Sequence, residues 1–520
     1  MRKKTLIFLL IIIAVASFFR LPKLDSIPPG LYPDEAINGN EAITNPGQVF
    51  YPENNGREGL FINLIHLSFS IFGISIWSLR LVSAVIGILT VLGLYLLTKQ
   101  LFIKCDEARP RHIALLSSFL LAISFWHVNF SRIGFRAILV PFILVFSFYF
   151  LFKGLRTQRK RDFIIAGVFF GLGFYTYSVF RSAVVLLAIV FLLWWLIYRK
   201  QNLEKKFLFF IFYFLFFIFI IALPIGIYFL QNPKDFIGRT AEVSIFTQDN
   251  KILAFGTSLI SHLGMFNLYG DSNWRHNISK SPVLFWPVGI LFLIGIAISI
   301  KKLIASIEIK NYSLFTVHCS LLFWFFIMLS PGILTYEGIP HSLRAIGAIP
   351  PTFIFAGMGI EFLWRKVKEK VKINKFLIFS IVLFFLSLLL AQYWRYFIFW
   401  GKNPEVENAF SKNYVKIGNH LNSLPPEAQK FVVVNQSGVP VPWPDGIPMS
   451  AQTTMFIENK KYGKPQSVYL LPEDLDKIKV NKMPTVIAPL QYDQNLFKIL
   501  QIMFPEGKIQ EKDGILIYQM

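Results

Sequence analysis

The chain has 520 residues, of which 54% are apolar and only 16% are charged, well below the roughly 25% of charged residues in soluble domains. Apolar runs of about 15 to 24 residues recur along the first three quarters of the chain, which excludes an ordinary soluble protein and indicates a polytopic membrane protein. The net charge of +22 does not indicate nucleic-acid binding, because Lys and Arg fall mostly in short blocks between apolar runs, as in the cytoplasmic loops of membrane proteins.

Eleven segments have the length and composition of membrane spans. They are residues 5–20, 78–98, 112–130, 137–153, 163–180, 182–198, 207–230, 282–300, 313–331, 344–363 and 376–394. If the N-terminus is cytoplasmic, all six inner segments carry a Lys/Arg cluster, and the densest lies between Arg365 and Lys375. This alternation predicts a multi-pass protein of the cell (inner) membrane with a cytoplasmic N-terminus. The first run could alternatively be a signal peptide cleaved near Ala14-Val15-Ala16, but the alternation of basic loops favours a retained first span.

Three large regions then lie outside the cytoplasm: residues 21–77, 231–281 and 395–520. Within the first, the apolar stretch from Gly59 to Ile74 has only 16 residues and is better explained as a helix lying in the membrane interface. We therefore expect a transmembrane domain over residues 1–394, with a first outer loop that carries the chemistry.

The last outer region changes in character and predicts a soluble extracytoplasmic α/β domain over residues 395–520. Short β-like runs alternate there with helical stretches, and a proline-rich loop covers 440–446. The expected strands are 431–434, 467–471, 485–488 and 515–518, and the expected helices are 406–424, 449–458 and 494–503.

Acidic residues gather in the first outer loop of this basic protein. Its sequence includes SIPPGLYPDEAINGNEA from Ser26 and FYPENNGREGL from Phe50. The prolines constrain the chain just before Asp34 and Glu35, and a carboxylate that is ionised at neutral pH can act as a general base. Solvated surface charge is the alternative explanation.

Several cationic side chains are expected on the same side of the membrane as these acids. They are Arg57, Arg80, Arg132, Arg136, Arg181, His341 and Arg344. Each one alone could be an interface anchor, and for Arg181 the two explanations are equally good. As a group they predict a phosphate-binding site, because arginine binds phosphate oxygens through paired N–H groups.

The sequence contains no pattern for a bound cofactor. The histidines lack metal-ligand spacing, so no metal site is predicted, although a divalent metal is not excluded. A phosphate-binding glycine loop and a dinucleotide fingerprint are likewise missing from the sequence, and no cofactor is predicted.

Five blocks together resemble bacterial members of glycosyltransferase family 39, the protein O-mannosyltransferase and aminoarabinose lipid A transferase group of the GT-C superfamily. In chain order they are YPDEAINGNEA, NGREGLFINL with SLRLVSAVIGILTV, FWHVNFSRIGFR, YTYSVFR and PHSLRAIGAIP. The resemblance runs from the first span to about residue 365. It implies a GT-C-like α-helical membrane fold of about eleven spans.

The resemblance also implies an activity: inverting transfer of a sugar from a polyprenyl-phosphate donor to an acceptor hydroxyl on a protein, lipid or glycan. By the same resemblance Asp34 is the base, Glu35 supports it, and Glu58 matches a second acid. Two adjacent side chains do not easily point into one pocket, so Glu35 is expected to pair with a nearby arginine. Arg57, Arg80, Arg132, Arg136, His341 and Arg344 are the expected donor phosphate-binding residues. A ligase or polymerase of lipid-linked glycans, and a non-enzymatic lipid flippase or transporter, remain the alternatives.

Overall fold

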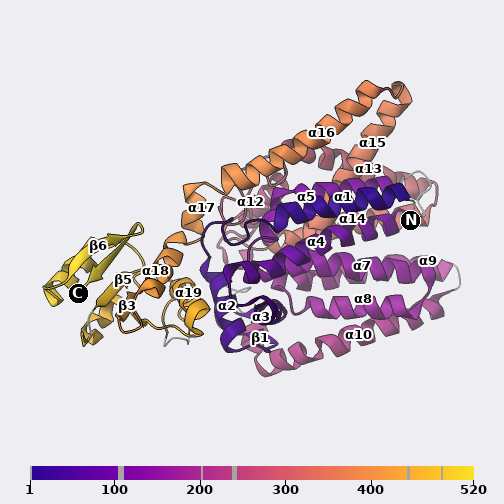
Figure 1. Cartoon of the computed structure of the whole chain (residues 1–520). Coiled ribbons are helices and arrows are strands. Elements are labelled where there is room, and N and C mark those ends of the chain that lie inside the picture. Colours follow the sequence, from indigo (N-terminus) through magenta and orange to yellow (C-terminus); the bar gives the residue numbers. More distant parts are fainter. Residues whose placement is uncertain (1–2, 104–109, 201–202, 237–242, 442–445, 482–483) are drawn as a thin grey trace. The chain divides into compact units, whose positions relative to one another are not determined.

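The computed structural model describes residues 3–103, 110–200, 203–236, 243–441, 446–481 and 484–520 (Figure 1). Two compact units share the chain. Unit 1 comprises Met1–Pro22, Ser83–Arg132 and Arg136–Trp400, and unit 2 comprises Lys23–Val82, Ile133–Phe135 and Gly401–Met520. Unit 2 thus combines most of the first outer loop with the C-terminal tail. The predicted domain boundary after residue 394 stays a prediction.

Unit 1 is helical. Its helices are α1 (Lys3–Arg20), α4 (Ile76–Leu101, from Ser83 onward), α5 (Pro110–Ile123), α6 (Phe125–Phe130), α7 (Leu139–Thr157), α8 (Lys160–Gly173), α9 (Ala183–Lys200), α10 (Glu204–Gln231), α12 (Lys251–Gly264), α13 (Trp286–Glu308), α14 (Tyr312–Ile333), α15 (Ile349–Lys370) and α16 (Lys375–Tyr393). Short 3₁₀ turns precede α7, α9 and α15, and a π-helical turn follows α16.

Eight helices within the described residues are long and apolar enough to cross a membrane. They are Ile76–Leu101, Arg136–Thr157, Ser178–Arg199, Lys205–Gln231, Trp286–Glu308, Tyr312–Ile333, Ile346–Lys370 and Lys375–Trp400. Each coincides with a predicted span. The other three predicted spans fall on α1, on α5 followed by α6, and on α8, which are helical but shorter or interrupted. The predicted class, a helical polytopic membrane fold with a small C-terminal sheet domain, is confirmed.

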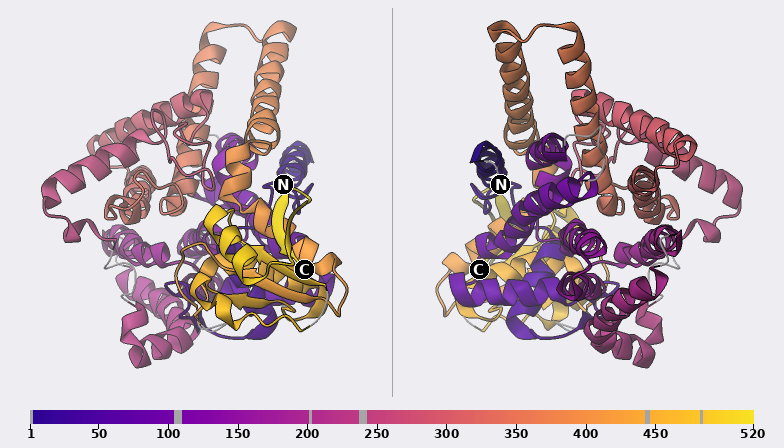
Figure 2. Two further views of the ribbon diagram at one scale, coloured as in Figure 1. Left: turned by 90° about the vertical axis from the view of Figure 1, so that its left-hand side faces the viewer. Right: turned by 90° about the vertical axis from the view of Figure 1, so that its right-hand side faces the viewer.

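The helices of unit 1 pack mainly in neighbouring pairs, α13 on α15, α7 on α8, α8 on α10 and α5 on α15. Figure 2 shows α15 and α16 joined by a short turn at one end. The side chains of α16 are mostly exposed, with Phe376 at 76% and Phe379 at 63%. Exposed apolar surface of this extent on a spanning helix fits contact with lipid tails, which are as apolar as the helix itself.

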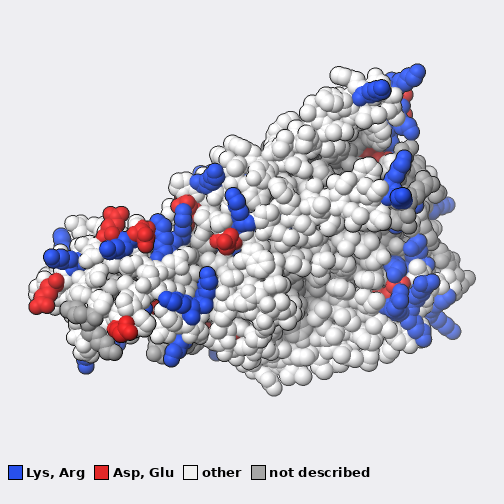
Figure 3. All heavy atoms as spheres, viewed as in Figure 1, with Lys and Arg blue, Asp and Glu red and all other residues white. Residues whose placement is uncertain are grey.

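Basic side chains gather at one end of unit 1, where α7 ends and α8 begins and where α15 ends and α16 begins (Figure 3). Arg159, Lys160 and Arg161 lie at the first place, and Lys368 and Lys370 at the second. Parts of the predicted basic segments 99–111 and 199–206 lie outside the described residues. This is the clustering that the loop alternation predicts, while the orientation in the membrane stays a prediction.

The loop part of unit 2 contains α2 (Pro33–Thr44), the paired strands β1 (Phe50–Tyr51) and β2 (Arg57–Glu58), and α3 (Leu60–Phe72). α3 covers the stretch that we expected to lie in the interface. With 13 residues it is too short to span a bilayer, which takes about 20. One face, including Phe61 and Ile65, is buried, whereas Ile71 and Phe72 are exposed.

The tail part of unit 2 is a five-stranded sheet in the order β4-β3-β5-β7-β6. Its strands are β3 (Gln429–Val433), β4 (Val468–Leu470), β5 (Thr485–Pro489), β6 (Lys508–Lys512) and β7 (Ile515–Gln519), and its helices are α17 (Pro404–Ala409), α18 (Lys412–Ser423), α19 (Gln452–Tyr462) and α20 (Gln494–Met503). β3 pairs in parallel with β4 and β5, and β7 pairs antiparallel with β5 and β6. All four predicted strands are present. Most of the predicted loop 440–446 lies outside the described residues.

The sheet separates two apolar clusters. One, which includes Ile417, Val432 and Met455, lies against α18 and α19, and the other, which includes Phe431, Phe497 and Leu500, lies against α20. Alternate residues of β3, Phe431 and Val432, therefore face opposite sides, as the period of two in a strand requires. α19 also packs on α2, so the sheet domain supports the helix that carries the two acids.

Candidate active site

The two acids found in the sequence begin α2. Tyr32 is the N-cap residue and Pro33 the first helical residue, a position that suits proline because its missing N–H is not needed there. Asp34 and Glu35 therefore lie in the first turn, where the helix dipole favours negative charge. Glu35 also accepts a hydrogen bond from the Tyr32 backbone N–H at 3.3 Å, which closes the turn.

Glu35 is fully buried and both of its carboxylate oxygens have hydrogen-bond donors. Oε2 accepts from Arg80 Nε at 2.9 Å and from the Gly134 backbone N–H at 2.7 Å, and Oε1 accepts from Arg80 Nη2 at 3.0 Å. The pairing that we expected between Glu35 and a nearby arginine is present. Such a two-point ion pair fixes the position of both side chains.

Arg80, near the start of α4, donates with all five of its N–H groups. Besides the bonds to Glu35, it donates to the backbone carbonyls of Leu24 at 3.0 Å, Pro28 at 2.8 Å and Gly30 at 2.8 Å. The guanidinium is fully buried. Arg80 thus holds the proline-rich segment before α2, and its geometry fits a structural clamp better than the donor phosphate contact expected from the sequence.

A second polar network continues along the same face of α2. Asn38 donates to the Gly134 carbonyl at 3.1 Å and accepts from Arg57 Nη1 at 3.0 Å. Arg57 is also buried and forms an ion pair with Glu41. Residues 35, 38 and 41 are spaced by three, which places them on one side of the helix. Arg57 therefore ties β2 to α2.

Asp34 differs from its neighbour in being partly exposed. Its Oδ1 accepts a hydrogen bond from Asn54 Nδ2 at 2.8 Å. Asn54, Asn55 and Gly56 form a turn with positive φ angles of 51°, 63° and 82°, a conformation that asparagine and glycine adopt more readily than other residues. The turn thus orients one carboxylate oxygen of Asp34 while the residue keeps access to solvent.

Glu58, the third predicted acid, lies in β2 opposite Phe50 and is 4% exposed. It belongs to the same unit as Asp34, Glu35, Arg57 and Arg80, so the structure brings five of the predicted site residues into unit 2.

The other predicted cations belong to unit 1. Arg132 is fully buried, donates to the carbonyls of Phe19 at 3.2 Å and Pro22 at 2.7 Å, and lies over the Phe397 ring at 5.0 Å. It therefore binds the chain at the end of α1. Arg136 is partly exposed, with its guanidinium 5.2 Å from the centre of the Tyr177 ring.

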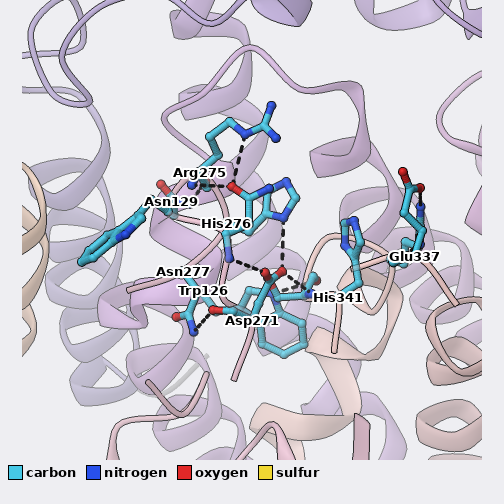
Figure 4. A network of polar contacts seen from close by, with 12 residues as sticks. Trp126, Asn129, Asp271, Arg275, His276, Asn277, Glu337 and His341 are labelled. Carbon is cyan, nitrogen blue, oxygen red and sulfur yellow. Dashed lines mark hydrogen bonds and ion pairs between the residues drawn. The ribbon is translucent and has the colours of Figure 1, made fainter. Parts of the chain in front are cut away.

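His341 and Arg344 lie in the connection between α14 and α15. Arg344 donates to Glu337 Oε2 at 2.9 Å and to the Glu337 carbonyl at 2.8 Å. His341 lies in a polar network around Asp271 (Figure 4), and its ring centre is 4.9 Å from that of His276. Asp271 and His276 come from the connection between α12 and α13, so the network joins two loops that are distant in the sequence.

Sequence reasoning missed several residues of these networks. Asn38, Asn54 and Gly134 each bond to a predicted site residue or to its partner, and Asp271 with His276 surrounds His341. The spacing of Glu35, Asn38 and Glu41 was a usable signal of a polar helix face. Gly134 acts through its backbone N–H, which no side-chain pattern reveals.

Comparison with known proteins supports the resemblance. Residues 60–228 match a family described as dolichyl-phosphate-mannose-protein mannosyltransferase. The crystal structure of ArnT from Cupriavidus metallidurans bound to undecaprenyl phosphate is similar, with a TM-score of 0.57 and 13% identity over 98% of this chain and 97% of that chain. Apo ArnT gives a TM-score of 0.55 at the same identity and coverage. Comparison with curated protein sequences gives no match. The family match bears out the expected resemblance over residues 60–228, and the similarity to ArnT shows that the two chains share a fold.

Proposed function

We propose that the chain is an integral membrane glycosyltransferase that moves a sugar from a polyprenyl-phosphate donor to an acceptor hydroxyl, with inversion at the sugar. The matching family is described by its use of dolichyl-phosphate-mannose, and the similar ArnT structure contains undecaprenyl phosphate. Both compounds are lipid-linked phosphates. The predicted outer segments of this chain carry several arginines, and arginine side chains are suited to binding phosphate. The donor, the acceptor and the surrounding membrane lipids are the partners that this proposal implies.

The observation that carries the proposal is the contrast between the two adjacent acids. Glu35 is buried, and both of its carboxylate oxygens accept hydrogen bonds. Asp34 is partly exposed, and within the described part of the chain its second carboxylate oxygen, besides the one that Asn54 binds, accepts no side-chain hydrogen bond. A carboxylate held by one hydrogen bond and open to solvent is able to accept a proton from an incoming hydroxyl. Asp34 is therefore the general base.

The chemical steps follow from that assignment. Asp34 removes the proton from the acceptor hydroxyl, and the oxygen attacks the anomeric carbon from the face opposite the phosphate. The bond between that carbon and the phosphate oxygen breaks, and the phosphate leaves with the electron pair. A polyprenyl phosphate is a stable anion, so no general acid is required, but cations that stabilise the developing charge accelerate the step.

The remaining predicted residues receive different roles. Glu35, Arg80 and Arg57 are positioning residues that hold α2 and the segments on either side of it. Glu58 remains a candidate second acid. Arg136 and Arg344 are the candidates for the donor phosphate, because Arg136 is partly exposed and Arg344 is paired with Glu337, whose side chain is 50% exposed and able to move away.

The proposal also places the reaction outside the cytoplasm, at the outer face of the cell (inner) membrane. The basic clusters at one end of unit 1 support a cytoplasmic location for that end. The first outer loop and the C-terminal domain are then extracytoplasmic, where lipid-linked sugars meet acceptors without access to nucleotide-sugars.

Replacing Asp34 by Asn tests the proposal. We expect turnover to fall by about 10²–10⁴-fold, the usual contribution of a positioned base, while a photoreactive polyprenyl phosphate still labels the protein. Asp25→Asn is the matched control, since Asp25 is an exposed acid of the same loop. Products are measured by mass spectrometry of envelope proteins and glycolipids from cells with and without each variant, at equal membrane levels of the protein.

The alternatives predict another result. A flippase or a glycan ligase does not depend on this pair of acids, so Asp34→Asn would leave its product unchanged. Full product formation by that variant would therefore refute the transferase proposal. Equal loss in Asp25→Asn would show that the effect is not specific to the base.

A further inference from the structure

Two loops of unit 1 bring three potential metal ligands together. Asp271 and His276 lie in the loop between α12 and α13, and His341 lies in the loop between α14 and α15. One ligand atom from each residue lies within 4.8 Å of the others. His276 Nδ1 is 3.1 Å from Asp271 Oδ2, and Figure 4 shows this contact beside the His341 side chain.

These distances suit a small tetrahedral ion. Bond lengths of about 2.0–2.2 Å to imidazole nitrogen and carboxylate oxygen place neighbouring ligand atoms about 3.3 Å apart in a tetrahedral site. The His276–Asp271 distance is already close to this value. Since no separation exceeds 4.8 Å, an approach of at most about 1.5 Å by a side chain would complete the geometry.

His341 distinguishes this cluster from an ordinary His–Asp hydrogen bond. Its Nδ1 atom is buried and has no hydrogen-bond partner among the described residues. A buried polar atom without a partner costs about 1–3 kcal/mol. A cation bound through Nδ1 would satisfy this nitrogen. Imidazole binds a metal ion through the lone pair of a ring nitrogen, which an unpartnered nitrogen has available.

Neighbouring groups hold the ligands in place. The Ser342 backbone N–H and hydroxyl donate to Asp271 Oδ2 at 2.8 and 2.9 Å, and the Asn273 backbone N–H donates to Oδ1 at 2.8 Å. The His341 backbone N–H donates to His262 Nε2 at 3.2 Å. Outer contacts of this kind orient the ligands of metal sites. Arg344 opposes a nearby cation, but its ion pair with Glu337 offsets that charge.

We propose that Asp271, His276 and His341 form a site for a divalent transition-metal ion such as zinc, with the fourth position occupied by water. Two imidazoles and one carboxylate are ligands that zinc prefers. The ion joins the two loops of unit 1. The sequence could not reveal the site, because 65 positions separate His276 from His341.

The test uses the full-length protein, purified in detergent through a tag without histidine, stripped with EDTA and titrated with ZnCl₂. We expect about one zinc per chain by elemental analysis, and at least tenfold weaker binding in Asp271→Asn and in His276→Ala. His318→Ala is the control, because His318 is also buried in unit 1 but bonds to Ser299, and it should bind zinc like the wild type.

A second measurement avoids the risk that a variant misfolds. Cobalt-loaded wild-type protein should show the intense visible absorption of a tetrahedral site, and X-ray absorption of the zinc form should show two imidazole ligands. Wild-type protein that binds no zinc, or Asp271→Asn and His276→Ala variants that bind it as well as the wild type, would overturn the proposal. These readouts do not depend on the transferase activity, so either proposal can fail alone.

Discussion

Glu35 and Arg80 form a fully buried ion pair in unit 2. A buried ion pair is costly to desolvate, and it persists when hydrogen bonds satisfy both partners, as they do here. The pair therefore fixes geometry: it joins α2, the start of α4 and the Gly134 backbone at one point. Asp34, one residue away, is held by that arrangement without being part of it.

Breaking this ion pair should lower the stability of the protein more than it affects the chemical step. Glu35→Gln leaves the Arg80 charge buried and unpaired, which costs about 3–5 kcal/mol, so we expect a large loss of thermal stability in detergent. Arg80→Lys should be similarly affected, because an ammonium group cannot replace the five N–H donors of the fork. Arg111→Lys is the control, since Arg111 is exposed. Wild-type stability of Arg80→Lys would contradict the clamp role.

The two adjacent acids of the candidate site could be predicted from the sequence, but their different surroundings could not. Asp34 and Glu35 could be identified because acids are rare in this chain and prolines surround them. The different roles of the two acids could not be derived from composition. They depend on contacts of Glu35 with Arg80, 45 residues away, and with the Gly134 backbone, 99 residues away. The sequence led us to expect that Arg80 binds the donor phosphate. An arginine near a membrane surface suits that role, and nothing in the sequence shows which backbone carbonyls the side chain contacts.

Among the elements, α2 depends on close packing against the C-terminal domain. Asn40 donates to Gln452 Oε1 at 2.7 Å and accepts from Asn459 at 2.8 Å, and Thr453 donates to the Leu31 carbonyl at 2.9 Å. Gly39 lies where the two helices meet: a Cβ atom there would be 2.5 Å from the Phe456 ring. Helix α19 is therefore part of the support for Asp34.

Replacing Gly39 by Ala tests this support. The added methyl group would also lie 2.9 Å from Leu79, so we expect a stability loss of about 1–3 kcal/mol, as for other overpacked cores, together with reduced turnover. Gly256→Ala is the control, because that glycine of α12 has open space around it. Phe456→Leu in the Gly39→Ala background should recover part of the loss. Unchanged melting of Gly39→Ala would show that α2 and α19 are not tightly packed.

The sheet shows which elements the sequence can and cannot reveal. The four apolar strands were predictable from their runs of β-branched and aromatic residues. β6, with the sequence KIQEK, was missed because it is charged and largely exposed. It is an edge strand, and charged residues are typical of edge strands because they prevent pairing with other chains. The charged sequence that made β6 hard to predict is thus a consequence of its place at the edge of the sheet.

For the whole molecule, the basic clusters predict which segments face the cytoplasm. Every span that the sequence suggested overlaps a helix, yet only eight described helices are both long and apolar enough to cross a bilayer by themselves. α8 has 14 residues and α5 has 14, too few for about 30 Å of hydrocarbon. The basic cluster at the N-terminal side of each of these helices carries the topological information that helix length does not.

Reporter fusions test this topology directly. A green fluorescent protein fused after Arg161 should fluoresce, because that basic segment is expected in the cytoplasm, whereas alkaline phosphatase fused there should be inactive. A fusion near residue 420 should give the reverse result, since the C-terminal domain is expected outside. A fusion within 364–375 provides the control, because this densest basic segment should behave like Arg161. If both fusions report the same side of the membrane, an even number of spans lies between residues 161 and 420. The inference that Asp34 is extracytoplasmic would then be wrong.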